Sequence, residues 1–172
     1  FLLMIGSTNF TRRKALLRFW RIQGDDDTSL VDYSDLIKAC GSMARSKTGA
    51  LIVIEGDSKL GFYASTGTPI GAQISAGLLE SIFAKNSPLH DGAVIVSGNK
   101  IVAAGCILPL TEKTNLPSRF GLRHRAALGI SEKANALAIV VSEETGEISV
   151  VRNDHFQNKV SLDELKLALK DD

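Results

Sequence analysis

Hydrophobic residues recur at helical spacing in residues 30–47, and a short apolar run follows them. The apolar positions of this segment are Val31, Leu36, Ile37, Ala39, Cys40, Met43 and Ala44. Residues three and four positions apart lie on one face of a helix, so this spacing predicts an amphipathic helix. The run at residues 50–54, directly after Gly49, predicts a buried strand.

The rest of the chain alternates between helical spacing and short apolar runs. Helices are predicted at residues 74–84, 123–130 and 161–169. Strands are predicted at residues 93–96, 101–108, 136–141 and 147–151. Strands flanked by helices on both sides predict an α/β domain over residues 30–172, with a mixed parallel and antiparallel central sheet enclosed by helices.

Local turn and capping signals support these boundaries. The pair Gly98-Asn99 lies between two apolar runs and is typical of a hairpin turn. Residues 144–146 predict a second turn, between the two strands that flank them. Ser161 and Glu164 have the spacing of a capping box, which marks the start of the final helix.

Residues 1–29 have a different pattern. Five basic residues alternate with large apolar residues over positions 12–22, and the acidic run 25–27 follows. We expect a basic amphipathic juxtamembrane segment and a linker, in which the basic side chains meet anionic headgroups. A helix packed on the domain and a frayed terminus are the alternatives. Because the sequence begins with Phe1 rather than Met, we also expect a further region before it.

Composition and charge narrow the classes of function. The 172 residues are 44% hydrophobic and 23% charged, which is ordinary for one globular domain. The 20 Lys and Arg residues are balanced by 19 Asp and Glu, so the chain lacks the basic excess of a non-specific nucleic-acid binder. No stretch approaches the ~20 apolar residues that span a bilayer. Cys40 and Cys106 form no C-x-x-C pair, so we expect buried thiols in a reducing cytosolic setting.

Polar residues interrupt the apolar pattern at three places. The first is His90-Asp91-Gly92-Ala93, at the entrance to a predicted strand. The Asp91 carboxylate can coordinate a divalent ion or accept a proton from a hydroxyl, and Gly92 allows the backbone to approach a ligand closely. An ordinary Asp-Gly turn is the alternative.

The second cluster is Arg123-His124-Arg125, at a predicted helix start. Forked guanidinium donors and free helix amides match the oxygens of a phosphate, so this cluster predicts an anion site. The alternative is a solvated run of charges, although the small residues Ala126 and Ala127 favour close packing.

The third cluster is Ser142-Glu143-Glu144, where a strand ends. Its carboxylates can bind a metal or a sugar hydroxyl, and an acidic hairpin turn is the alternative. All three clusters fall at strand ends or helix starts, where α/β domains place ligands. Together they predict one site, with cations for phosphates and carboxylates for a metal.

Several familiar signatures are missing from the sequence. It contains no G-x-x-x-x-G-K-[ST] run, no G-x-G-x-x-G after a strand, no G-x-S-x-G elbow and no H-E-x-x-H. The common nucleotide-binding loops and hydrolase sites that these patterns identify are therefore excluded. The sequence also argues against a nucleophilic cysteine, because both cysteines fall in apolar segments, where a small buried thiol is expected.

The sequence resembles the diadenylate cyclase domain family, which is marked by an Asp-Gly-Ala motif and an Arg-His-Arg motif. These motifs are residues 91–93 and 123–125 here. The resemblance continues through residues 48–52, 66–67, 86–90, 108–110, 125–132 and 140–146. The basic N-terminal segment is similar to that of the membrane-tethered branch of the family, rather than to the DNA-scanning branch.

This resemblance implies an enzyme that condenses two ATP molecules into cyclic di-AMP and releases two pyrophosphates, with Mn²⁺ or Mg²⁺ as cofactor. It also implies a mixed sheet enclosed by helices. Because the product is two-fold symmetric, we expect a homodimer with two active sites face to face. We expect the domain to face the cytoplasm from the cell membrane, tethered through the preceding region, and to have no nucleic-acid partner.

The resemblance also implies roles for single residues. Asp91 would serve the attacking 3′-hydroxyl through the metal, with His90 and Glu144 as further metal ligands, and the two small residues after Asp91 would leave room for the nucleotide. The three residues of the Arg-His-Arg motif and Ser142 would contact phosphates, and Glu143 or Glu144 would hold the metal or the ribose. The other nucleotide-binding positions would be Thr66, Gly67, Leu108 and Leu122. The backbone at Leu108 would read the adenine edge.

Two positions depart from the pattern of the family. Many members have Thr before the Arg-His-Arg motif, where this chain has Leu122 and lacks the hydroxyl donor. Some members stack adenine on a Tyr where this chain has Ile107, which offers apolar contact alone. Both changes bear on ATP affinity, and neither touches the two motifs.

Two functions from other classes remain open at this point. One is a non-catalytic module that senses an adenine nucleotide at the same residues. The other is a membrane-surface adaptor that uses residues 12–22, which would leave the later clusters without a purpose.

Overall fold

The fold is taken from a computed structural model, which describes residues 30–170. The predicted juxtamembrane segment and linker, residues 1–29, lie outside the described residues. The helices and strands belong to the compact unit that begins at Asp32. Within residues 30–170, no helix combines the length and the apolar character that crossing a membrane requires.

Helices and strands alternate along the described chain. In chain order they are α2 (Ser34–Ser46), β1 (Ala50–Glu55), α3 (Gly61–Ala64), β2 (Thr68–Gln73), α4 (Ala76–Phe83), β3 (Ala93–Ser97), β4 (Lys100–Cys106), α5 (Leu122–Lys133), β5 (Ala136–Val141), β6 (Ile148–Arg152), β7 (His155–Gln157) and α6 (Leu162–Lys170). The strands form one sheet in the order β2-β4-β3-β1-β5-β6-β7. β1 and β3 run parallel, and the other pairs are antiparallel, so the predicted mixed sheet is confirmed.

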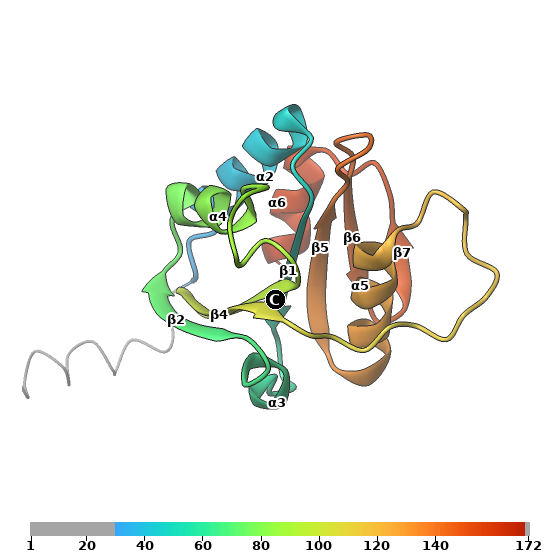
Figure 1. The fold of residues 1–172 in the computed structure, drawn as a ribbon, viewed down its shortest axis with the longest axis horizontal. Helices are drawn as coiled ribbons and strands as arrows, with labels where there is room; N and C mark the ends of the chain where they lie inside the picture. The colour runs from blue at the N-terminus through green and yellow to red at the C-terminus, as the bar shows by residue number, and fades with distance from the viewer. Residues whose placement is uncertain (1–29, 171–172) are drawn as a thin grey trace, which may run out of the picture. The chain divides into compact units, whose positions relative to one another are not determined.

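Strand β1 shows why the sheet is covered on both faces. Ile52 and Ile54 pack in the cluster formed with α2, α4 and α6, whereas Leu51 and Val53 pack in the cluster formed with α5. Successive side chains of a strand point to opposite faces, so a continuous apolar run needs cover on both. Figure 1 shows α2, α4 and α6 grouped on one side of the sheet, with α5 on the other.

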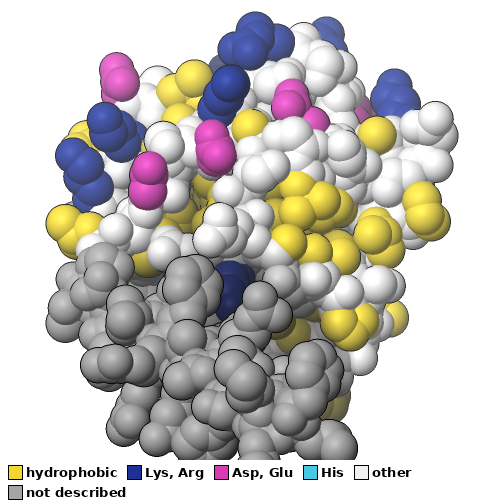
Figure 2. Space-filling view, turned by 90° about the vertical axis from the view of Figure 1, so that its left-hand side faces the viewer, with side chains coloured by type: hydrophobic (Ala, Val, Ile, Leu, Met, Phe, Trp, Pro, Cys, Tyr) yellow, Lys and Arg dark blue, Asp and Glu magenta, His cyan; other side chains and the backbone are white. Residues whose placement is uncertain are grey.

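The two edges of the sheet are short or interrupted. Strand β2 carries Pro69, and its pairing with β4 shifts between Pro69 and Ala72, where Gly71 has a φ of 63°. A proline and a bulge blunt an edge that would otherwise pair with another chain. Figure 2 looks onto this side of the molecule, where hydrophobic side chains lie across the middle and most of the charged side chains lie above them.

The local signals in the sequence are confirmed. Ser97 pairs with Lys100 across the Gly98-Asn99 turn. The amide of Glu164 donates to Oγ of Ser161 at 3.1 Å, and the amide of Ser161 donates to Oε1 of Glu164 at 3.4 Å, which completes the capping box. The predicted helices and strands are all present, with ends that differ by a few residues.

Three elements were not predicted, each for a physical reason. The proline and glycine in β2 remove the apolar alternation of a strand. Helix α3 has four residues, which is too short to show a periodic pattern. Strand β7 has three residues with mainly exposed side chains.

One close contact shapes the side of the domain on which α5 lies. Gly129 of α5 packs against the main chain at Pro109, and an added Cβ would overlap the carbonyl oxygen of Pro109. The segment between β4 and α5 therefore lies directly on the helix. This contact fixes the path of residues 108–110 after they leave the sheet.

We predict that Gly129→Ala lowers the free energy of unfolding by about 1–3 kcal/mol, because the added methyl group must displace backbone rather than a flexible side chain. The measurement is urea unfolding followed by circular dichroism.

Gly77→Ala is the matched control, since Gly77 lies in helix α4 and an added Cβ meets nothing nearer than Oγ of Ser75 at 4.0 Å. This control should be neutral or stabilising, by up to about 1 kcal/mol. Equal free energies of unfolding for the two variants would contradict the prediction.

Candidate active site

A cavity of about 330 Å³ lies where β3 begins, β4 ends and α5 starts. Its lining residues are Leu51, Asp91, Gly92, Ala93, Gly105, Cys106, Ile107, Leu108, Leu110, Leu122, Arg123 and Ala126. The Asp-Gly-Ala motif and the first residue of the Arg-His-Arg motif, far apart in the sequence, thus share one cavity. The sequence predicts that Asp91, Arg123 and Arg125 converge on one ligand; Asp91 and Arg123 line this cavity, and Arg125 does not.

The Asp-Gly-Ala motif enters strand β3 at the edge of this cavity. Asp91 is exposed, and Ala93 is buried and pairs with Cys106 of β4. Gly92 has a φ of 111°, and a Cβ on it would lie 2.7 Å from the carbonyl carbon of Gly105. A glycine is therefore required at position 92, because a side chain would overlap β4 and because residues other than glycine rarely adopt this φ. Gly92 also lines the cavity, and close approach of a ligand to its backbone stays a prediction.

Arg123 lies in the first turn of α5 and is paired with the turn between β5 and β6. Its Nη1 lies 3.4 Å from Oε1 of Glu143, and the side chains are 24% and 54% exposed, respectively. Nε of Arg123 is buried and has no hydrogen-bond partner among residues 30–170. A buried donor without a partner is unfavourable. The Arg123 side chain lines the cavity, so its guanidinium is placed to attract an anion there.

The other two residues of the Arg-His-Arg motif do not line the cavity. The ring of His124 stacks on Phe120, with centroids 4.9 Å apart, and lies 6.0 Å from the ring of Phe156. Its Nδ1 accepts a hydrogen bond from the amide of Gly121 at 3.3 Å. Burial lowers the pKa of His124 below its ordinary value, so the ring is neutral at pH 7.

Arg125 is half-buried, and its carbonyl oxygen accepts a hydrogen bond from the amide of Thr111 at 3.0 Å. This bond ties the start of α5 to the segment that follows β4. Contact of His124 and Arg125 with phosphates stays a prediction from the resemblance.

The turn between β5 and β6 holds the third polar cluster. Oγ of Ser142 accepts hydrogen bonds from the amides of Glu144 and Thr145, at 3.2 and 3.3 Å. Glu143 and Glu144 are exposed, and Glu143 reaches Arg123. The third cluster therefore meets the second through an ion pair, although its residues do not line the cavity.

Thr66 and Gly67 support the end of β4 rather than lining the cavity. Oγ1 of Thr66 donates to the carbonyl of Tyr63 at 2.6 Å and accepts from the amide of Ile107 at 2.9 Å. A Cβ on Gly67 would lie 2.6 Å from Sγ of Cys106. Both residues thus hold the strand that forms one wall of the site.

Apolar side chains form the other walls of the cavity, and several of these residues were not predicted from the sequence. Ile107, Leu110 and Leu122 are 70%, 51% and 72% exposed at the cavity, while Leu108 is buried. Leu51, Gly105 and Ala126 also line it, and they could not be distinguished from ordinary core residues by sequence pattern. A flat apolar ring such as a nucleobase fits walls of this kind.

The two thiols are unsuited to nucleophilic chemistry. Burial raises the pKa of Cys40 to about 12 and that of Cys106 to about 11, so both stay protonated at pH 7. Cys106 lines the cavity as a small buried side chain. The expectation of buried thiols is confirmed.

The predicted metal ligands offer a partial set of donors. No group of three or more His, Cys, Asp or Glu side chains able to hold a metal occurs in the described part of the chain. Nδ1 of His90 lies 2.7 Å from the carbonyl oxygen of Ser87. A carbonyl only accepts, so Nδ1 donates in this contact, as it does in many histidines that bind metals. Of the three predicted ligands, Asp91 alone lines the cavity, so a metal site at these residues stays a prediction from the resemblance.

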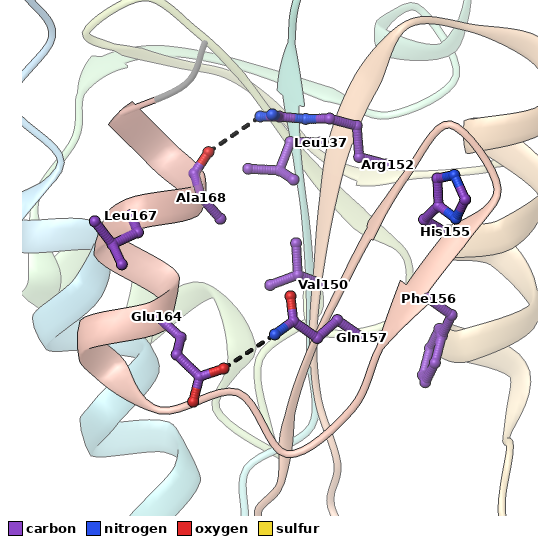
Figure 3. Close-up of a pocket in the computed structure, with 9 residues that line it drawn as sticks. All are labelled: Leu137, Val150, Arg152, His155, Phe156, Gln157, Glu164, Leu167 and Ala168. Atoms are coloured by element: carbon purple, nitrogen blue, oxygen red, sulfur yellow. Dashed lines mark hydrogen bonds between the residues drawn. The ribbon is translucent and has the colours of Figure 1, made fainter.

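A second cavity, of about 400 Å³, lies between α6 and the β6–β7 hairpin (Figure 3). Two hydrogen bonds cross it, from Nη2 of Arg152 to the carbonyl of Ala168 at 3.1 Å and from Nε2 of Gln157 to Oε2 of Glu164 at 3.0 Å. Its lining contains none of the predicted site residues. The smaller cavity is therefore the candidate active site.

Known proteins match this chain in sequence and in structure. Cyclic di-AMP synthase CdaA of Bacillus subtilis is 47% identical over 135 residues, which are 78% of this chain and 50% of that protein. A diadenylate cyclase of Listeria monocytogenes has the same identity and coverage. The chain thus spans half the length of these curated relatives.

Two solved structures share the fold. A double mutant of DacA from Staphylococcus aureus has a TM-score of 0.78 and 42% identity, over 80% of this chain and 91% of that one. A hypothetical membrane spanning protein from Bacillus cereus has a TM-score of 0.71 and 47% identity, over 74% of this chain and 63% of that one.

A family model matches residues 37–156, which include both motifs and every residue that lines the candidate site. The match covers well over half of the chain. The chain therefore belongs to the DAC family, which is described as the nucleotide-binding domain of the DisA bacterial checkpoint controller.

Proposed function

We propose that this chain is the catalytic part of a diadenylate cyclase, which condenses two ATP molecules into cyclic di-AMP and releases two pyrophosphates. The observation that carries the proposal is the convergence of Asp91 and Arg123 on one cavity with apolar walls. A carboxylate, a guanidinium and a flat apolar slot are the groups that a ribose hydroxyl, a triphosphate and an adenine require. The names of the relatives support the same activity.

In each half of the reaction, the 3′-hydroxyl oxygen of one ATP forms a bond to the α-phosphorus of the other. The bond between the α-phosphorus and the bridging oxygen breaks, and pyrophosphate leaves with the bonding electrons. Asp91 orients the hydroxyl and accepts its proton. Arg123 donates to the phosphate oxygens and balances the charge that develops on the leaving pyrophosphate.

Apolar contacts hold the base. Leu108 and Ile107 at the end of β4, with Leu122 at the start of α5, contact the adenine ring. No hydroxyl stands at position 122, so adenine is held there by apolar contact alone.

His90, Asp91 and Glu144 are the residues that would hold a divalent cation, Mn²⁺ or Mg²⁺, together with the triphosphate. Such an ion supplies charge neutralisation at the phosphates. The hydrogen bond from Nδ1 to the carbonyl of Ser87 orients the ring of His90.

A symmetric product requires two ATP molecules with opposed orientations. We propose that two copies of the domain meet face to face, each holding one ATP. The exposed rim formed by Ile107, Leu110 and Leu122 offers apolar surface at the mouth of the cavity for such a contact.

We further propose that the domain works at the cytoplasmic face of the cell membrane, tethered through residues that precede it, and binds no nucleic acid. The relative from Bacillus cereus is titled a membrane spanning protein, which supports the tether. The balanced charge of the chain argues against a nucleic-acid partner.

Incubation with ATP and Mn²⁺ tests the activity directly. We expect a cyclic dinucleotide with the mass of cyclic di-AMP, and two pyrophosphates for each dinucleotide, because both α-phosphates are attacked. The products are measured by mass spectrometry and a pyrophosphate assay. Binding of ATP without any dinucleotide would favour the non-catalytic nucleotide sensor instead.

Asp91→Asn should lower turnover by about 10²–10⁴-fold while ATP affinity stays within about threefold, because the change keeps the size of the side chain and removes its charge. Turnover is measured by dinucleotide formation, and affinity by calorimetry.

The control for Asp91→Asn is Asp163→Asn, which alters an exposed carboxylate at the start of α6, away from the cavity. It should retain the activity of the unmodified chain. Turnover of Asp91→Asn equal to that of the control would refute the role of Asp91.

Dilution tests the face-to-face arrangement. The dinucleotide formed per milligram of protein should fall as the protein is diluted through the concentration at which it sediments as a monomer, because each site needs the ATP held by its partner. The paired measurements are analytical ultracentrifugation and specific activity across one dilution series. Constant specific activity in the monomer range would rule out the arrangement.

A further inference from the structure

Gly49 contacts both side chains of the ion pair between Arg123 and Glu143, although it does not line the cavity. A Cβ built on Gly49 would lie 2.7 Å from Nη1 and 2.9 Å from Cζ of Arg123, and 3.0 Å from Oε2 of Glu143. Nη1 of Arg123 and Oε1 of Glu143 are themselves 3.4 Å apart. The guanidinium and the carboxylate therefore both rest against the bare Cα of this glycine.

The end of helix α2 places Gly49 at this point. Lys47 adopts the left-handed conformation, with a φ of 53°, and the amide of Thr48 donates to the carbonyl of Met43 at 2.8 Å. These features end the helix and turn the chain into strand β1, which starts at Ala50. Thr48 and Gly49 are the two residues between the helix cap at Lys47 and the start of β1 at Ala50, so the position of Gly49 is fixed from both sides.

The turn that carries Glu143 is anchored to the same helix end. Gly146 has a φ of 74°, and its Cα packs against the carbonyl of Ala44 so closely that no side chain fits. The end of α2 therefore holds both the recess at Gly49 and the turn that supplies Glu143. Arg123 reaches this support from the first turn of α5.

The contact at Gly49 differs in kind from the other tight glycine contacts. At Gly129 and Gly146 an added Cβ would meet backbone, which cannot move without distorting the fold. At Gly49 it would meet the far ends of two flexible side chains. A methyl group at position 49 therefore costs little stability and is accommodated by moving the guanidinium of Arg123.

We propose that Gly49 is a positioning residue for Arg123: its missing side chain forms the recess that seats the guanidinium where it can bind the anionic part of the ligand. Nη1 and Cζ of Arg123 lie at the recess and the Arg123 side chain lines the cavity, so the recess sets where the guanidinium would meet an anion. The identity of that acceptor as a triphosphate rests on the proposed function. The position of the Arg123 guanidinium is inferred from its contacts with Gly49 and Glu143 alone.

Gly49→Ala tests the proposal. The thermal midpoint should stay close to that of the unmodified chain, while affinity for the non-cleavable ATP analogue with a methylene bridge between the α- and β-phosphorus falls about tenfold. The ratio kcat/KM for dinucleotide formation should fall at least as far. Gly61→Ala is the control, since an added Cβ there meets nothing within 4 Å, and it should bind the analogue normally.

A double-mutant cycle with Arg123→Ala separates positioning from a general effect on the fold. Gly49→Ala should cause no further loss of analogue affinity once the Arg123 side chain is absent, because the two residues act through one group. An equal loss in both backgrounds would overturn the proposal. Unfolding of Gly49→Ala would overturn it as well, since the proposal requires the flexible side chain to absorb the added methyl group.

The same measurements distinguish this proposal from the proposed function. If the unmodified chain binds the analogue and shows the coupling but forms no cyclic dinucleotide, the cyclase activity fails and the seat at Gly49 stands. If the chain forms cyclic di-AMP and Gly49→Ala behaves like Gly61→Ala, the seat at Gly49 fails and the cyclase activity stands.

Discussion

The candidate site depends on three glycines at which one stretch of main chain packs directly against another. Gly92 lies on the end of strand β4, Gly129 lies under the carbonyl of Pro109, and Gly146 lies against that of Ala44. Each contact joins segments that are distant in the sequence, at a separation that a side chain would prevent. The cavity walls are therefore set by the backbone, whose positions do not depend on the choice of a rotamer.

The charged side chains of the site, Arg123 and Glu143, are joined by a weak interaction. The pair between Arg123 and Glu143 is partly exposed, and exposed ion pairs are worth only about 0–1 kcal/mol. A triphosphate carries several negative charges and offers acceptors in the geometry that a guanidinium matches. In the proposed reaction, a triphosphate therefore competes with Glu143 for Arg123 at little cost in free energy.

The sequence predicted most of the fold because the central strands are apolar on both faces and the longer helices are periodic. It failed at β2, where Pro69 and Gly71 interrupt the apolar pattern of a strand that nonetheless pairs with β4 on both sides of a bulge. For the site, Asp91 and Arg123 were found because charges beside buried strands stand out. Leu51 and Gly105 were missed, because their role at the cavity depends on which strands become neighbours, and periodicity carries no information on this.

The Arg-His-Arg motif is a second case in which the sequence pattern does not tell which side chains reach the cavity. Three successive residues suggest three groups around one phosphate, but neighbours on a helix point in directions about 100° apart. Arg123 therefore reaches the cavity, while His124 turns into the rings of Phe120 and Phe156. There it is neutral and accepts from the amide of Gly121, so it steadies the start of the helix that carries Arg123. In the structure, the middle residue of the motif therefore supports the helix start, and its contact with phosphate stays a prediction.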